Sequence, residues 1–266
     1  YVHASLWEGA RMSKAPIHPF RHNQPGSLAK KAQRHGPGIV VVDAIYSSNG
    51  DVCPMVEIVE VAEQHGCLLV VDESHSVGTY GANGEGLVAS LGLSDRVHYR
   101  TLSLSKAFAT RAGLVAGPAR VMEFFRHEAR SMLFSSAIMP HEIAGLRATL
   151  EVIQSEGWRR EKLWERATYL RRRLSELGYN VDESDSQVVA LEAGPERRSM
   201  QLRDALENAG IFGAVFCAPA TPQNRSLIRL SINSALTDAQ VERIIRVCAD
   251  VRDPVDLDTW PSTLRR

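Results

Sequence analysis

The sequence has no excess of either charge and no long apolar segment. Its 266 residues include 31 Lys and Arg against 31 Asp and Glu, so the formal net charge is zero. Overall charge therefore gives no support for binding to nucleic acid or to an anionic membrane. The longest aliphatic runs, 39–42 and 68–71, are far shorter than the ~20 apolar residues of a membrane-spanning helix. We expect neither a nucleic acid nor a membrane as partner.

The chain also lacks any cysteine motif. Its four cysteines show no C-x-x-C spacing, which argues against a disulfide framework and against a zinc site (Cys53, Cys67, Cys217, Cys248). This usage favours a reducing compartment, so we expect a cytoplasmic protein without a metal. With 44% hydrophobic and 23% charged residues, the composition is that of a globular protein and not of a disordered one.

The first half of the chain alternates apolar runs with helical stretches. We expect strands at 38–47, 67–73, 97–103 and 112–117, and a helix at 54–65. Continuous apolar strands separated by helices are typical of a parallel sheet covered on both faces. The fold class is therefore α/β with a mostly parallel sheet and flanking helices.

The second half predicts a smaller α+β domain. Two helices are expected between 140 and 177, followed by alternating strands and helices (strands 187–192, 215–217 and 227–233; helices 199–209 and 237–251). Thr237 is the expected cap of the last helix. We place the boundary between a domain at 1–145 and a domain at 146–266. From Asp253 onward the tail looks polar and loosely held.

Polar side chains follow three of the predicted strands. Asp43 ends the first, Asp72 and His75 follow the second, and Ser103 and Lys106 follow the third. In open parallel sheets, ligands bind beyond the carboxyl ends of the strands. The 34-residue spacing from Asp72 to Lys106 suits one strand–helix–strand crossover. These residues are therefore expected at one edge of the sheet.

Such a set has the chemistry that pyridoxal phosphate (PLP) requires. A lysine can hold the aldehyde as a Schiff base, a carboxylate can pair with the ring nitrogen, and hydroxyls can bind the phosphate. A lysine partly removed from water is also the better nucleophile. Taken singly, Asp72 is more often a turn residue, His75 a packed histidine and Lys106 a solvated side chain. On spacing alone, a PLP site and these structural roles are about equally well supported.

Several blocks of the sequence resemble the α-oxoamine synthases, PLP enzymes of fold type I that join an amino acid to an acyl-CoA. The blocks occur in family order and span the chain to about residue 250 (3–9, HASLWEG; 71–78, VDESHSVG, continuing through Gly81, Gly84 and Gly86; 103–108, SLSKAF; 134–140, FSSAIMP; 228–231, IRLS). The resemblance implies the fold type I transferase fold.

Within that family, three segments are most similar to the autoinducer synthases of bacterial quorum sensing (34–43, 106–113 and 215–221). The resemblance implies an acyltransferase that condenses an amino acid or S-adenosylmethionine with a fatty acyl-CoA to a long-chain aminoketone. Many family members carry glycines after the lysine, where this chain has Ala107 to Arg111, and this departure agrees with the autoinducer subgroup. The alternatives are another PLP enzyme of fold type I, such as an aminotransferase, a decarboxylase, or an 8-amino-7-oxononanoate or 2-amino-3-ketobutyrate synthase, or a catalytically inactive relative.

The resemblance also implies roles for residues around the cofactor ring. Lys106 would form the Schiff base and remove the α-proton of the substrate. Asp72 would pair with the ring nitrogen, and His75 would bond the 3-hydroxyl with the help of Ser47. His3 would stack on the ring.

Other roles concern the phosphate, the substrate and the partner subunit. Ser103 would bind the phosphate, and Ser135 and Ser136 would reach the phosphate of the neighbouring subunit in a homodimer with shared active sites. Arg229 would bind the substrate carboxylate through a bidentate pair. Alternatively, Ser135 and Ser136 cap the helix near Pro140, and Arg229 forms a structural salt bridge.

Two further expectations concern a loop and the N-terminal end. We interpret 78–86 as a turn-rich connection and not as a phosphate cradle, because it lacks the G-x-x-x-x-G-K-[ST] arrangement. The α-oxoamine synthases have a substantial N-terminal portion that is not found in this chain, which begins at Tyr1. We expect the first domain to be incomplete there.

Overall fold

The computed structural model describes residues 1–260, which form two compact units. The N-terminal unit comprises residues 2–45 and 53–157. The C-terminal unit comprises Tyr1, residues 46–52 and residues 158–260. The sequence predicts a domain boundary near residue 145, whereas α7 (Pro140–Ser155) lies wholly in the N-terminal unit.

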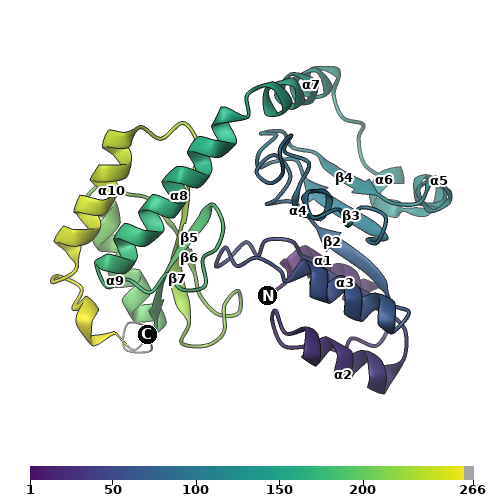
Figure 1. The fold of residues 1–266 in the computed structure, drawn as a ribbon, viewed down its shortest axis with the longest axis horizontal. Helices are drawn as coiled ribbons and strands as arrows, with labels where there is room; N and C mark the ends of the chain where they lie inside the picture. Colours follow the sequence, from purple (N-terminus) through teal and green to yellow (C-terminus); the bar gives the residue numbers. More distant parts are fainter. Residues whose placement is uncertain (261–266) are drawn as a thin grey trace. The chain divides into compact units, whose positions relative to one another are not determined.

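A four-stranded sheet organises the N-terminal unit, in the order β1-β2-β3-β4 (Figure 1). Strands β1 (Ile39–Asp43), β2 (Leu68–Asp72) and β3 (Tyr99–Ser103) are parallel, and β4 (Gly113–Ala116) runs antiparallel to β3. All four predicted strands are present, each shorter than predicted. The mostly parallel sheet of the prediction is confirmed.

Helices on this sheet follow from apolar spacing. In α3 (Met55–Gln64), the buried side chains of Met55, Ile58, Val59 and Ala62 recur at the i, i+3, i+4 and i+7 positions of one helical face. The other helices are shorter or more polar (α1, Ala4–Met12; α2, Pro25–His35; α4, Leu87–Ser90; α5, Ala119–Glu128; α6, Arg130–Leu133). Within residues 1–260, no helix is long and apolar enough to span a membrane.

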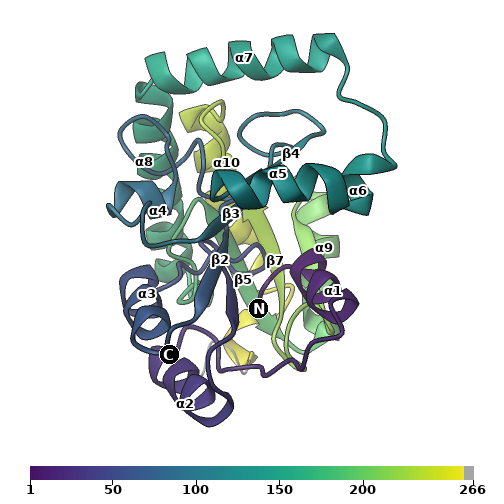
Figure 2. The ribbon, with the colours of Figure 1, turned by 90° about the vertical axis from the view of Figure 1, so that its right-hand side faces the viewer.

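The apolar runs predicted a sheet that is covered on both faces. Among residues 1–260, this cover does not extend over its whole width. Leu114 and Val115 of the edge strand β4 are exposed, and so are Phe124 of α5 and Ile143 of α7. Figure 2 shows α5 and α6 end to end, followed by an extended segment that leads to α7. Isolated apolar side chains are common on protein surfaces, but a series of them along neighbouring elements is typical of an interaction surface.

The C-terminal unit is a three-stranded antiparallel sheet, ordered β5-β7-β6, with three helices packed on one face (Figure 1). Its strands are β5 (Val188–Gly194), β6 (Ala214–Phe216) and β7 (Ser226–Ser231), and its helices are α8 (Trp158–Glu176), α9 (Glu196–Asn208) and α10 (Asp238–Val251). The predicted cap of α10 is confirmed, since Thr237 Oγ1 accepts from Gln240 N at 3.2 Å. The predicted α+β arrangement is therefore present.

The prediction of a loosely held tail is wrong for residues 253–260. Val255, Leu257 and Trp260 are buried in the core formed with α8, α9 and α10. Trp260 is only 1% exposed, and its Nε1 donates to Val255 O at 2.8 Å. These apolar residues alternate with aspartates, so they form no continuous run that a sequence pattern would identify.

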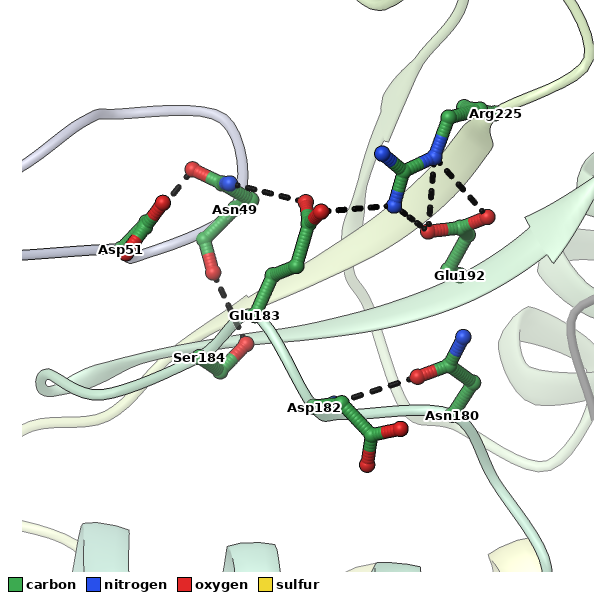
Figure 3. A network of polar contacts seen from close by, with 8 residues as sticks. All are labelled: Asn49, Asp51, Asn180, Asp182, Glu183, Ser184, Glu192 and Arg225. Atoms are coloured by element: carbon green, nitrogen blue, oxygen red, sulfur yellow. Dashed lines mark hydrogen bonds and ion pairs between the residues drawn. The ribbon is translucent and has the colours of Figure 1, made fainter. Parts of the chain in front are cut away.

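A polar network explains why the short segment 46–52 belongs to the C-terminal unit (Figure 3). Asn49 Nδ2 donates to Glu183 Oε2 at 3.1 Å, and Ser184 Oγ donates to Asn49 O at 2.8 Å. Arg225 Nη2 lies 2.8 Å from Glu183 Oε1 and 2.5 Å from Glu192 Oε2. The Arg225 guanidinium thus connects Glu183, which contacts the segment 46–52 through Asn49, to Glu192 of strand β5.

Candidate active site

The parallel strands of the N-terminal unit bring acidic and hydroxyl side chains to one edge of the sheet. Asp43 ends β1 and Asp72 ends β2, and the two are register partners. Thr101 of β3 is the register partner of Asp72 on its other side. Alternate residues of a strand point to the same face, so the three side chains lie in one row across the sheet.

Both oxygens of the Asp72 carboxylate are held by donors. Thr101 Oγ1 donates to Oδ2 at 2.9 Å, and Ser74 N donates to Oδ1 at 2.9 Å. Hydrogen bonds to a carboxylate favour its charged form. Each oxygen can accept more than one hydrogen bond, so the carboxylate can still accept from a ligand.

Three serines connect the ends of β2 and β3. Ser103 N donates to Ser74 Oγ at 2.7 Å, and Ser103 Oγ lies 2.8 Å from Ser105 Oγ. In such a pair, one hydroxyl uses its hydrogen on the other. Each hydroxyl has only one hydrogen, so the second can donate to another acceptor, such as an anion.

Lys106 follows this cluster in a tight turn. Its carbonyl accepts a hydrogen bond from Ala109 N at 3.0 Å. Leu104 N donates to Ala112 O at 2.9 Å across the same turn. Lys106 is exposed, in contrast to the expectation of a lysine partly removed from water. Its ammonium acts electrostatically on Asp43 and favours the charged form of that carboxyl.

Asp43 is deeply buried at this edge, with 3% of its surface exposed. Burial raises its pKa to about 8, and the neighbouring negative charge of Asp72 acts in the same direction. Its carboxylate accepts from His3 N at 3.1 and 3.4 Å. His3 is the N-cap of α1, where its Nδ1 accepts from Ser5 N at 3.2 Å, so Asp43 holds the start of that helix at the ends of the strands.

The loop after β2 carries His75 and is organised by the buried Glu73. Glu73 Oε1 accepts from Val88 N at 2.9 Å and from Ser76 Oγ at 3.0 Å. Burial raises the pKa of Glu73. The prediction of a turn-rich connection over 78–86 is confirmed, because the segment is a series of turns that Glu73 ties to α4. His75 lies within this loop, where its carbonyl accepts from Thr79 Oγ1.

Ser135 and Ser136 lie in the exposed segment between α6 and α7. Ser135 Oγ donates to Met132 O at 3.4 Å. Neither serine caps α7, because the N-cap of that helix is Met139. The capping alternative is therefore wrong, and the structure shows no contact between these serines and Lys106 or Asp72.

Ser47 and Arg229 both belong to the C-terminal unit and contact each other there. Arg229 Nη1 donates to Ser47 O at 2.7 Å, and the guanidinium lies 4.8 Å from the ring centroid of Phe216. Arg229 Nε is buried without a hydrogen-bond partner. No ion pair of Arg229 occurs among the described contacts, so the salt-bridge alternative has no support. Burial lowers the pKa of Arg229.

Sequence reasoning did not assign roles to Thr101 and Ser74, and it named Asp43 only as a strand end. A hydroxyl or a carboxyl near a strand end is common, and nothing in its spacing says which neighbour it contacts. The useful signal is register: once Asp72 is aligned with Thr101, the hydroxyl falls beside the carboxylate.

Comparison with known proteins supplies the family. Residues 1–247 match the sequence profile described as aminotransferase class I and II. The chain belongs to the aminotransferase class I and II family.

Relatives of this family member include α-oxoamine synthases, which confirms the resemblance read from the sequence. This chain is 44% identical over 258 residues to a CAI-1 autoinducer synthase of Vibrio campbellii. The match covers 97% of this chain and 65% of that protein. The chain is also 34% identical over 253 residues to an 8-amino-7-oxononanoate synthase of Symbiobacterium thermophilum. This match covers 94% of the chain and 64% of that protein. This chain thus spans a little under two thirds of the length of these two relatives.

Solved structures confirm the fold type I transferase fold. A serine palmitoyltransferase of S. paucimobilis with bound PLP–myriocin superposes with a TM-score of 0.91 at 29% identity. The match covers 96% of this chain and 65% of that one. The Sphingomonas wittichii serine palmitoyltransferase gives a TM-score of 0.90 at 27% identity, with coverage of 96% and 65%.

Proposed function

We propose that this protein binds PLP at the sheet edge of the N-terminal unit and acts as an acyltransferase. The observation that carries the proposal is the hydrogen-bonded Asp72 carboxylate, on the same sheet edge as Lys106 and a serine pair. A cationic ring nitrogen needs a facing anion, an aldehyde needs a primary amine, and a phosphate needs donors. These residues supply all three, so they fit the cofactor. The relatives with PLP bound support the same assignment.

Residues of the N-terminal unit would contact different parts of the cofactor. Asp72 would keep a negative charge beside the ring nitrogen, and Lys106 Nζ would hold the aldehyde carbon. Ser103 would donate to the phosphate, and its backbone is fixed for this by Ser74. His75 would bond the 3-hydroxyl, and His3, anchored by Asp43, would stack on the ring.

PLP, when bound, supplies an electron sink for the carbanion that forms at the substrate α-carbon. Lys106 Nζ would accept the proton that leaves that carbon, as a general base. Arg229 would bind the substrate carboxylate, because a half-buried guanidinium whose Nε donor has no hydrogen-bond partner can form a bidentate pair. Ser47, whose carbonyl accepts from Arg229, would assist at the 3-hydroxyl.

The substrates proposed are an amino acid or S-adenosylmethionine and a fatty acyl-CoA. The carbanion would attack the thioester carbon, and CoA would leave as the thiol. Loss of the substrate carboxylate as CO2 would then give the long-chain aminoketone. Similarity to the CAI-1 autoinducer synthase supports this reaction over that of other relatives. An aminotransferase or decarboxylase reaction is the second candidate, because the family description includes aminotransferases.

We also propose a homodimer with shared active sites, in which Ser135 and Ser136 bind the phosphate in the partner's site. Exposed apolar side chains flank these serines. Phe134 is 79% exposed, and Met132, Leu133 and Met139 are each about half exposed. Burial of this segment against a second copy would remove the apolar surface from water. Sedimentation of the purified protein tests it, and a strictly monomeric protein would contradict the shared site.

Absorption spectroscopy tests the cofactor assignment. The purified protein, incubated with PLP and dialysed, should show the visible band of a lysine-bound cofactor. Lys106→Ala should lose this band, whereas Lys162→Ala, which removes a lysine from α8, should retain it. A band that persists in Lys106→Ala would contradict the assignment of Lys106.

Product analysis tests the reaction. Mass spectrometry of the protein offered mixed acyl-CoAs and amines should detect aminoketones whose mass tracks the acyl chain. Amino-acid turnover without dependence on acyl-CoA would favour the second candidate. Absence of cofactor binding would favour a catalytically inactive relative.

A further inference from the structure

Two carboxyl groups compete for negative charge at the edge of the sheet. Asp43 and Asp72 are register partners, and the charge of each opposes the charge of the other. Two carboxylates that share a site cannot both ionise without a large cost, so one of them retains a proton more strongly. Which of the two keeps the negative charge decides whether a cationic ring has a facing anion.

The surroundings of the two groups differ in a way that answers this question. Asp72 is only partly buried and accepts from two donors on separate oxygens, Thr101 Oγ1 and Ser74 N. Asp43 is almost wholly buried and accepts only the backbone N–H of His3 among the hydrogen bonds described, with contacts at 3.1 and 3.4 Å.

The remaining charges near the pair do not reverse this difference. Lys106 acts on Asp43 and favours its charged form, but this effect is smaller than those of burial and of the charge of Asp72. Thr101 is the one side-chain donor described for either carboxyl. Its hydroxyl is held in place by the register of β3 with β2 and not by a flexible loop.

We infer that Thr101 is a positioning residue that keeps the negative charge of the pair on Asp72 and leaves the proton on Asp43. Together with Ser74 N, the hydroxyl restrains both oxygens of the Asp72 carboxylate. This inference rests on the proposed function only in assigning a cationic ring as the group that Asp72 faces. The division of charge itself is a property of the chain.

Carboxyl ¹³C NMR tests the division of charge without any cofactor. Protein labelled at Asp Cγ is measured at pH 7, with the two resonances assigned through Asp43→Asn and Asp72→Asn. In the wild-type protein, Asp72 should resonate as a carboxylate and Asp43 as a carboxylic acid. Thr101→Val, which keeps the shape and strand propensity of threonine, should move the Asp72 resonance toward the acid position, and Thr101→Ser should restore it.

Unchanged Asp72 and Asp43 resonances in Thr101→Val would overturn the inference. Thr149→Val is the control, because Thr149 Oγ1 donates to a backbone carbonyl on α7, and it should leave both resonances unchanged. A second measurement uses the loaded protein: the ¹⁵N shift of labelled PLP should indicate a protonated ring nitrogen in wild type and in Thr101→Ser. In Thr101→Val it should move toward that of a neutral pyridine.

The two measurements distinguish a failure of the proposed function from a failure of the inference about Thr101. If the protein does not take up PLP but Thr101→Val still shifts the Asp72 resonance, the proposed function fails and the inference stands. If PLP binds through Lys106 but neither resonance responds to Thr101→Val, the inference fails and the proposed function stands.

Discussion

Asp43 and Asp72 end two neighbouring parallel strands at the same register position, so the sheet itself sets two carboxyl groups side by side. The arrangement has a cost in stability, because burial and mutual repulsion disfavour two negative charges there. Such costs are characteristic of functional sites and not of cores optimised for stability alone.

Asp43→Asn should change how stability depends on pH. Burial raises the pKa of Asp43 to about 8, far above the usual value of 3.8, so the folded protein keeps this proton over a range where the unfolded chain has lost it. The free energy of unfolding of the wild type should therefore fall as pH rises from about 4 to 8, by up to about 1.4 kcal/mol per pH unit from this group. Asn has no such titration and can still accept from His3 N.

Urea unfolding at pH 5, 6, 7 and 8 measures this effect as the difference between variant and wild type. The stability of Asp43→Asn relative to wild type should rise with pH. Asp95→Asn, at an exposed carboxylate of the same unit, is the control. Parallel curves for wild type and Asp43→Asn would contradict the buried, protonated state.

Gly78→Ala should destabilise the protein through a contact with the lysine segment. A Cβ at Gly78 would lie 2.5 Å from Ala107 Cβ, and the φ of +85° disfavours any L side chain. Gly92 has a similar φ of +68° but no atom within 4 Å of its added Cβ, so Gly92→Ala reports the backbone strain alone. We expect Gly78→Ala to cost about 1–3 kcal/mol more than Gly92→Ala in urea unfolding.

A double variant isolates the clash. Adding Ala107→Gly to Gly78→Ala removes the opposing methyl group and should recover part of the loss. If the double variant is no more stable than the sum of the single changes, the close approach of the loop to the lysine segment is not the cause.

Arg225→Gln should destabilise the C-terminal unit. The hydrogen bonds with Glu192 and Glu183 raise the pKa of Arg225, and the Glu192 side chain is only 10% exposed (Figure 3). Removing the guanidinium leaves that carboxylate without its partner, and because Arg225 is itself about one third exposed, we expect a loss of about 1–3 kcal/mol. Arg172→Gln, which breaks an exposed pair with Glu176, should cost about 0.5 kcal/mol or less. Equal losses in thermal unfolding would argue against a special role of the network.

Trp260→Ala should show that the tail belongs to the core. The side chain is 1% exposed, and its loss should cost about 3–5 kcal/mol in urea unfolding. Trp158→Ala is the matched control, since Trp158 is 49% exposed and its contacts with Arg159 and Lys162 contribute about 1 kcal/mol or less. A change of less than about 1 kcal/mol for Trp260→Ala would mean that the tail is loosely held after all.

Local patterns were sufficient for much of the architecture. The runs at 39–42 and 68–71 determine two strands because aliphatic residues without interruption have few other stable environments, and Thr237 determines the start of α10 through its own side chain. The ordered blocks around His3, Asp72 and Lys106 determine the family. Each of these signals lies within a few residues of chain.

Tertiary structure alone decided how those pieces meet. The contact of Thr101 with Asp72 depends on the register of two strands that lie 29 residues apart, and a shift of one residue would turn the hydroxyl to the other face. Burial of Trp260 depends on the space left between helices far from it in the sequence. The charge state of Asp43 likewise depends on what surrounds the group in space, which the linear order of residues does not contain.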